Sequence, residues 1–313
     1  MINTQPETTT RRPDRAAVEP ALRPPPDARL PAPVRILIGF VGFVAVLFAA
    51  GLGVPLGLTT LLPTIPLVVV NLIGMATFCG GSVALAAGLA RLDGRHRHPE
   101  LGSPLAQLGL RWSRREAAML GLTFVVLVLA TVALAGISRL TGLAAPVPEV
   151  ASIPIAAVLG GLAYAFLPSF VMQGFPEELI FRGYVMNAAK VRVGVALAIS
   201  SLLFGSLHLL SQSPAEGVVE KFVLYPLQAV ALGFVCGAAQ IGTGSLWAAV
   251  GVHGGMHIGT RIAGLLAAPH DYGLQLILVT GLYVVLGVLF LVLRSRLAPR
   301  SSPQVPGGAG GSN

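Results

Sequence analysis

Long apolar runs separated by short polar stretches fill most of the chain, and this pattern predicts membrane-spanning helices. Most of the runs are close to the ~20 residues that a helix needs to cross a bilayer. The eight runs are 36–54, 65–90, 117–138, 153–189, 193–210, 222–241, 245–264 and 274–293. The fourth run is too long for one straight span and contains Pro168, Gly174 and Pro176. This run predicts either one kinked helix or two separate helices. Two separate helices would raise the number of segments to nine.

The two ends of the chain lack such runs. Residues 1–35 are rich in Pro and Arg, and residues 295–313 are rich in Gly, Ser and Pro. Segments of this composition cannot bury enough apolar surface to fold, so we predict two disordered tails. Between them, residues 36–294 form one predicted transmembrane helical domain. The sequence therefore predicts an all-α integral membrane protein.

Composition excludes the main alternatives to a membrane protein. Only 11% of the residues are charged and 54% are hydrophobic, with a mean hydropathy of +0.78. Soluble domains contain about 25% charged residues, which they need to cover their surface. A disulfide scaffold is excluded because the chain has only two cysteines, Cys79 and Cys236. Both lie inside apolar runs, where we expect packed thiols.

The positive charges indicate orientation in a membrane. The formal charge is +8, but basic residues sit at the ends of apolar runs and do not cluster with aromatic residues. If there are eight spans, 18 of the 21 Lys and Arg residues fall on one side, and only Arg139, Lys221 and Arg261 fall on the other. The positive-inside rule then places both termini in the cytoplasm. We expect membrane lipids as partners and no nucleic acid.

A few ionisable residues lie inside the spans, where they are costly and usually functional. They are Glu177, Glu178, Arg182, His208, His253 and His257. Counted from the nearest polar turn at 1.5 Å per residue, Glu177 lies about 20 Å deep and His208 about 24 Å deep. His253 and His257 lie about 16 and 22 Å deep by the same rise. Residues from three spans therefore reach one layer, as a single site requires.

Helical spacing gives these residues partners. Glu178 and Arg182 are four residues apart in the favourable order, so they can neutralise each other within one helix. Glu177 is then the carboxylate left over, and we predict that it acts as a base. Phe204 and His208 share one helical face, and His253 and His257 share another.

Three motifs follow one another in order. Residues 177–182 read EELIFR, an EExxxR motif, and residues 204–208 read FGSLH, an FxxxH motif. Residues 244–247 read GSLW and are followed by His253 and His257. Together the motifs resemble the CPBP family, the CAAX protease and bacteriocin-processing (Abi-like) intramembrane endopeptidases. The resemblance covers about residues 160–265 and implies a multi-pass membrane peptidase.

The resemblance implies a role for each matching residue. Glu177 matches the catalytic glutamate that activates water, and His208 matches the histidine that assists at the water. Glu178 and Arg182 match the supporting pair, and Phe204 belongs to the second motif. His253 matches the histidine of the third motif. That motif ends in Asn or Asp in the family, and His257 stands there instead.

This departure leaves two chemistries open. His257 can donate a hydrogen bond to an oxyanion, as the Asn of the family is thought to do. It can also bind a metal, because two histidines four residues apart can hold one ion. In that case Glu177, His208, His253 and His257 are the candidate zinc ligands. The sequence has no HExxH motif, since Gly254 follows His253.

We predict an intramembrane endopeptidase that acts on membrane-associated proteins or peptides. Its expected location is a bacterial cytoplasmic membrane, because Arg far outnumbers Lys and Ala, Gly and Pro are abundant. One alternative is a non-catalytic bacteriocin-immunity or peptide-binding membrane protein. Another is a proton-coupled transporter, for which broken helices in matching halves are the usual signal. Only one broken run is evident here, and we find no internal repeat.

Overall fold

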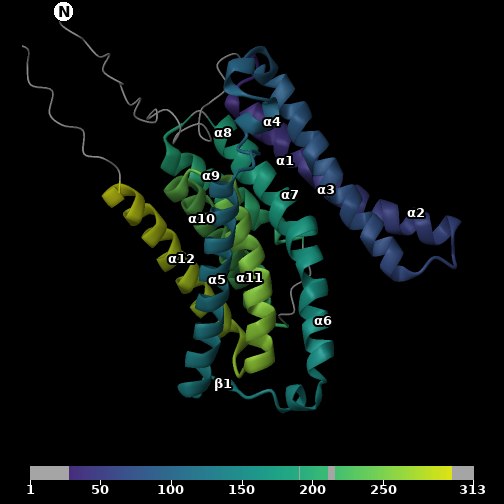
Figure 1. Cartoon of the computed structure of the whole chain (residues 1–313), viewed down its shortest axis with the longest axis vertical. Helices are drawn as coiled ribbons and strands as arrows, with labels where there is room; N and C mark the ends of the chain where they lie inside the picture. The colour runs from purple at the N-terminus through teal and green to yellow at the C-terminus, as the bar shows by residue number, and fades with distance from the viewer. Residues whose placement is uncertain (1–27, 190, 211–215, 298–313) are drawn as a thin grey trace, which may run out of the picture.

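The structure is a computed structural model that describes residues 28–189, 191–210 and 216–297. Within these ranges it is almost entirely helical (Figure 1). The helices are α1 (Ala32–Phe48), α2 (Val54–Leu61), α3 (Leu67–Leu92), α4 (Pro104–Gln107), α5 (Arg114–Leu140), α6 (Ile155–Phe166), α7 (Phe175–Glu178), α8 (Met186–Ala188), α9 (Val193–Leu207), α10 (Tyr225–Thr243), α11 (Leu246–Leu266) and α12 (Tyr272–Leu297). The π-helical segments are Ala49–Gly53, Leu167–Gly174, Leu179–Val185 and Glu220–Leu224. Two short strands, β1 (Ala144–Ala145) and β2 (Ala268–Pro269), pair antiparallel.

Each of the eight predicted runs coincides with a helical segment. Six segments are long and apolar enough to cross a membrane: Ala32–Leu61, Leu67–Leu92, Arg114–Leu140, Ile155–Ala188, Glu220–Thr243 and Tyr272–Arg296. Val193–Leu207 is apolar but shorter. α11 is less apolar because it contains His253, His257 and Arg261. The prediction of an all-α, multi-pass membrane protein is confirmed.

The long fourth run is one uninterrupted helical segment, so the alternative of two pieces is wrong. The segment extends over 34 residues, from Ile155 to Ala188. Its prolines do not break it, because Pro168 stands in the first turn of the π-helical segment Leu167–Gly174 and Pro176 in the first turn of α7. The wider π-helical turns accommodate the missing backbone donors and change the direction in which the following side chains point. Such turns are frequent at functional sites.

The helical domain is longer than predicted at both ends. α1 begins at Ala32, so Arg35 belongs to a helix and not to the predicted tail, and α12 continues to Leu297. Arg35 is buried and donates to both carboxylate oxygens of Asp93 at 3.1 Å, and to the carbonyl of Ala188 at 2.6 Å. This buried pair joins the start of α1 to the end of α3. Residues 1–27 and 298–313 of the predicted tails lie outside the described residues.

α5 and α11 lie side by side at the centre of the molecule, with α12 on one side and α6 on the other (Figure 1). α10 packs along α12 and α9. α1, α2 and α3 extend away to the side (Figure 1). They are tied to the centre by aromatic rings, since Phe43 contacts both Phe78 and Phe181, and Phe181 contacts Phe204, each pair with centroids 5.4 Å apart.

Candidate functional site

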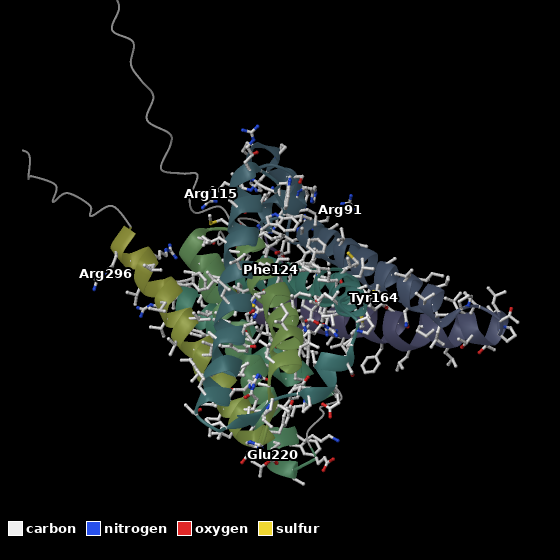
Figure 2. The ribbon with its side chains drawn as sticks, turned by 60° about the horizontal axis from the view of Figure 1, so that its bottom comes forward. Arg91, Arg115, Phe124, Tyr164, Glu220 and Arg296 are labelled. Carbon is white, nitrogen blue, oxygen red and sulfur yellow. The ribbon has the colours of Figure 1, made fainter. Side chains whose placement is uncertain are left out.

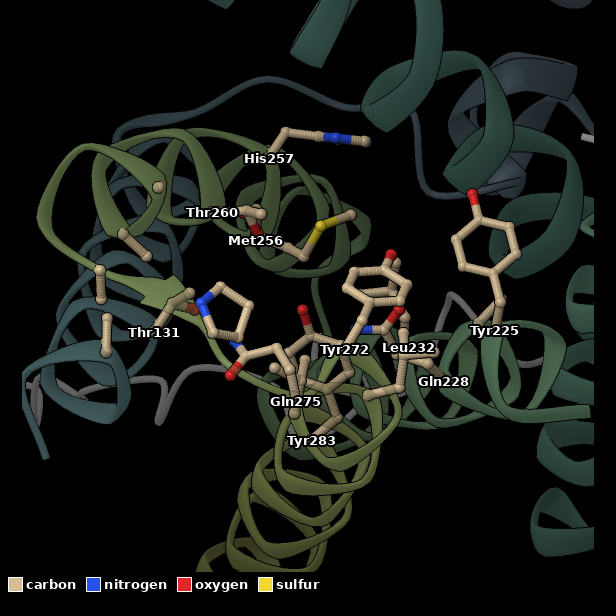
Figure 3. A pocket seen from close by; sticks show the side chains of 18 of the residues that line it. Thr131, Tyr225, Gln228, Leu232, Met256, His257, Thr260, Tyr272, Gln275 and Tyr283 are labelled. Carbon is tan, nitrogen blue, oxygen red and sulfur yellow. The ribbon is translucent and has the colours of Figure 1, made fainter. Parts of the chain in front are cut away.

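The structure brings the four predicted catalytic residues around one cavity of about 400 Å³. Glu177 comes from α7, His208 follows the end of α9, and His253 and His257 come from α11. Figure 3 shows His257 beside this cavity, with Tyr225 on the opposite side. The depths counted from the sequence agree with this arrangement, because all four side chains border the same space.

Glu178 and Arg182 form the ion pair that their spacing predicts, and both side chains are completely buried. Arg182 donates to Glu178 Oε1 at 3.0 Å and to the carbonyl of Gly233 on α10 at 2.7 Å. The guanidinium carbon also lies 4.8 Å from the centroid of the Phe204 ring, which allows a cation–π contact. The pair therefore joins the α7 region to α9 and α10 directly behind the cavity.

His253 stands between the two glutamates. Its Nδ1 lies 2.8 Å from Glu178 Oε1, and its Nε2 lies 3.8 Å from Glu177 Oε2. A carboxylate oxygen only accepts, so Nδ1 is the donor in the first contact. This hydrogen bond fixes the ring so that Nε2 faces Glu177, whose side chain keeps 15% of its surface exposed. Glu178 thus orients His253, while Glu177 borders the cavity.

The second motif places an aromatic ring between the two histidines. His208 Nδ1 donates to the Phe204 carbonyl at 3.1 Å. The Phe204 ring lies edge-on to His253 at 5.7 Å, and its centroid is 5.0 Å from that of His208. Phe204 itself is completely buried. The buried Phe204 ring therefore packs against both imidazoles.

Glycines let the helices that hold Glu177 and His253 approach each other closely. A Cβ on Gly174 would lie 2.8 Å from the Ser169 carbonyl oxygen and 3.5 Å from the Gly254 nitrogen. A Cβ on Gly254 would lie 2.2 Å from the Phe170 ring. A Cβ on the next glycine, Gly255, would lie 2.7 Å from the Phe124 carbonyl oxygen on α5. Gly254 and Gly255 therefore allow α11 to pack closely against its neighbours.

Gly254→Ala is expected to lower both stability and activity. The added methyl has no room against the ring of Phe170, and overpacking of this kind typically costs about 1–3 kcal/mol. Thermal unfolding in detergent measures the loss. The matched control is Gly160→Ala on α6, where a Cβ meets nothing within 4 Å. The account of the glycine contact fails if the two variants unfold at the same temperature.

The third motif closes the end of the bundle that is remote from β1. Gly244 ends α10 with a positive φ of 71°, which allows the tight turn into α11. Trp247 stacks on Phe175 with ring centroids 5.7 Å apart and meets Trp112 edge-on at 4.8 Å. Its Nε1 donates to the Arg111 carbonyl at 2.5 Å. Trp247 is thus a packing residue at this end of the bundle.

Several lining residues were not predicted from the sequence. Tyr225, Gln228, Tyr272 and Gln275 border the cavity from α10 and α12 (Figure 3). Cys236 is completely buried close to Glu178 and His253, which goes beyond the packed thiol that we expected. None of these residues carries a charge, so the search for ionisable residues inside spans did not find them. For Gln228 and Gln275, a polar glutamine inside an apolar run was the signal in the sequence that could have identified them.

The residues that gather most closely differ from the predicted metal ligands. Among the described residues, the ligand atoms of Glu178, Cys236 and His253 lie within 4.8 Å of one another, and no three of the predicted set do so. In this trio, Glu178 Oε1 already accepts from Arg182 and from His253 Nδ1. The neighbouring guanidinium also opposes a second cation. Neither donor set, as folded, fits a metal ion, and we derive no step through one.

The fold and this site define a multi-pass helical membrane protein with a buried glutamate–histidine centre. The family model described as Type II CAAX prenyl endopeptidase Rce1-like matches residues 159–259, from α6 to the middle of α11. The matched segment contains all three motifs, and the resemblance drawn from them is confirmed. The match supports an intramembrane endopeptidase of the CAAX protease type. No curated protein and no solved structure gives a significant match.

Proposed function

We propose that the chain is an intramembrane endopeptidase that hydrolyses peptide bonds of membrane-associated proteins or peptides, with water activated by Glu177 and the histidines. The observation that carries this proposal is the placement of Glu177 Oε2 and His253 Nε2, 3.8 Å apart at the edge of one cavity. His208 and His257 border the same cavity. The family match supports the reaction class, and the positions of these side chains support the choice of residues.

The reaction begins at Glu177. Its carboxylate takes a proton from a water molecule that His208 orients, and the water oxygen attacks the carbonyl carbon of the peptide bond. The tetrahedral intermediate collapses when Glu177 returns the proton to the amide nitrogen and the C–N bond breaks. The products are a new carboxylate and a new amine. One water molecule is consumed, and Glu177 returns to its starting state.

The oxyanion of the intermediate is stabilised by His253 and His257. Glu178 accepts from Nδ1 of His253 and thereby keeps Nε2 directed at the reacting group. The ring of His257 stacks on that of His253, with centroids 5.2 Å apart and planes 22° apart. With Nδ1 bonded to Glu178, Nε2 of His253 donates to the oxyanion only when both ring nitrogens carry a proton, so the imidazolium form of His253 is the donor. His257 is the second donor, and the two rings held in this way need little rearrangement as charge develops on the oxygen.

Variants of His257 separate the oxyanion role from a metal-binding role. His257→Asn is expected to keep activity within about tenfold of wild type, or about 1.4 kcal/mol, because the amide also donates a hydrogen bond. His257→Ala is expected to lose about 10²–10³ in rate, the usual effect of removing an oxyanion donor. Initial cleavage rates in proteoliposomes measure both variants. Equal loss in both variants, restored by added zinc, contradicts the oxyanion role.

The proposed function is tested by comparing the termini of membrane proteins. Cells carrying wild-type protein or Glu177→Gln, at matched expression, are compared by mass spectrometry of their membrane-protein termini. New termini in the wild-type cells alone are the expected result, and they name the substrates. The control is Glu100→Gln, a loop carboxylate with 63% of its side chain exposed, which is expected to match wild type. Identical termini in all cells contradict the proposal and favour a binding protein.

A further inference from the structure

We propose that the cavity receives its substrate from the non-cytoplasmic face of the membrane, and that the substrate is an uncharged, extended polypeptide segment on that side. The proposal deepens the proposed function and rests on it, because the polypeptide in the cavity is a substrate only if the protein is a peptidase. The direction of access does not depend on catalysis. Three sets of observations carry it: the charge at the two ends of the bundle, the position of the cavity and the packing at the closed end.

The two ends of the bundle differ in charge. Arg91, Arg115 and Arg296 lie toward one end, and Glu220 lies toward the opposite end (Figure 2). Five of the other eleven described arginines also belong to the first end, because they stand in or beside the loop between α3 and α5 or at the end of α12: Arg95, Arg97, Arg111, Arg114 and Arg294. The positive-inside rule assigns this arginine-rich end to the cytoplasm. The end with β1 and β2 is then the non-cytoplasmic end.

The cavity occupies the half of the bundle nearer to β1 and β2. On α11 its lining begins at His253 and continues past Thr260 to the end of the helix. On α5 it lies between Thr131 and Ser138, in the last turns before β1. α10 and α12 both begin at the non-cytoplasmic end, and their lining residues stand in the first three turns or so. Ala144 and Pro269, from the two strands, also line it.

The arginine-rich end is closed by side chains. Leu108 is completely buried against the Gly183 turn, and a Cβ on Gly109 would lie only 3.0 Å from the Cβ of Leu246. Trp112 and Trp247 pack together just below. Arg115 donates to the Thr243 carbonyl, and the Ser245 hydroxyl donates to Glu116. A peptide entering from this end would have to separate all of these contacts.

The lining indicates what the cavity accepts. Thr260, on α11, is exposed, so the cavity is bordered by an accessible polar group on this side. Its polar members farther from Glu177 are neutral amides and hydroxyls, among them Gln228, Tyr272 and Gln275 (Figure 3). Such groups both donate and accept, as the backbone of an extended peptide requires. Among the described lining residues Glu177 is the only carboxylate and no Lys or Arg is present, so a charged side chain bound away from Glu177 and the histidines would have no charged partner.

Labelling of single cysteines tests the direction of access. Thr260→Cys is made in the full chain, whose own Cys236 is buried and whose Cys79 gives the background in the unsubstituted protein. A membrane-impermeant maleimide is added to intact cells and to permeabilised cells. Thr141→Cys, at the β1 end and outside the cavity, and Arg97→Cys, at the arginine-rich end, are the side controls. We expect Thr260→Cys and Thr141→Cys to label in intact cells, and Arg97→Cys to label only after permeabilisation.

Labelling of Thr260→Cys only after permeabilisation, together with Arg97→Cys, overturns the proposal. Gln275→Cys on α12 repeats the test if Thr260→Cys does not fold. Each measurement is repeated with Glu177→Gln, which is expected to leave the labelled side unchanged because labelling needs no catalysis. A wrong direction of access therefore leaves the proposed function standing. Absence of cleavage with the expected labelling refutes the proposed function alone.

Discussion

Glu177→Gln is expected to reduce peptide cleavage by about 10²–10⁴-fold, the usual contribution of a general base, and to leave the fold intact. Glutamine has the shape of glutamate but cannot take a proton from water. The side chain lies at the edge of the cavity and keeps 15% of its surface exposed, so the packing around it changes little. The rate is measured on a substrate identified by its new terminus, in proteoliposomes of purified protein.

Two outcomes contradict this prediction. Activity within about tenfold of wild type, a barrier difference of only about 1.4 kcal/mol, removes Glu177 from the chemistry. A loss of activity that is accompanied by a large fall in the unfolding temperature assigns Glu177 a structural role instead. Glu100→Gln, far from the cavity and exposed, is expected to change neither quantity. The comparison separates a carboxylate that reacts from one that only carries charge.

Arg182→Met is expected to destabilise the protein by about 3–5 kcal/mol, because removal of one partner leaves a buried charge without compensation. Glu178 has no exposed surface, and its Oε1 would keep only the hydrogen bond from His253. The Gly233 carbonyl would also lose its donor. Thermal unfolding in detergent measures the effect. Arg91→Met, an exposed arginine on α3, is the control that is expected to unfold as wild type does.

The double variant Glu178→Gln with Arg182→Met tests the reason for that loss. It removes both charges and keeps an oxygen that can accept from His253 Nδ1. We expect it to be more stable than Arg182→Met alone. A double variant that is less stable than Arg182→Met contradicts the explanation by an uncompensated charge. An Arg182→Met variant within about 1 kcal/mol of wild type shows that the pair contributes no more than an exposed ion pair.

The sequence predicted those features that depend on local spacing. Each of the eight apolar runs coincides with a helical segment, because a bilayer fixes the length of a span. The separation of four residues predicted the pair of Glu178 and Arg182. Helical rise predicted that Glu177 and His253 reach one depth, and they lie at the edge of one cavity. The three motifs indicated a resemblance to the CAAX protease family, and the family model that matches residues 159–259 bears out that resemblance.

Contacts between distant parts of the chain were not predictable from spacing. Arg35 was assigned to a tail because its partner Asp93 stands 58 positions later, in a polar stretch. Cys236 faces Glu178 from another helix, and nothing in the apolar run around it marks that position. The length of the first span was underestimated because Pro55 lies within it, where a π-helical segment keeps the helix continuous. These features depend on tertiary packing and not on local pattern.

Incubation of purified protein with a membrane-embedded substrate in H₂¹⁸O tests the central claim most directly. Hydrolysis by activated water places one oxygen from the solvent in the new C-terminal carboxylate. We predict a new C-terminus with one ¹⁸O for wild type, and none for Glu177→Gln over the same time. A new terminus with ¹⁸O at the wild-type rate in the Glu177→Gln variant, or no new terminus with either protein, would contradict the account.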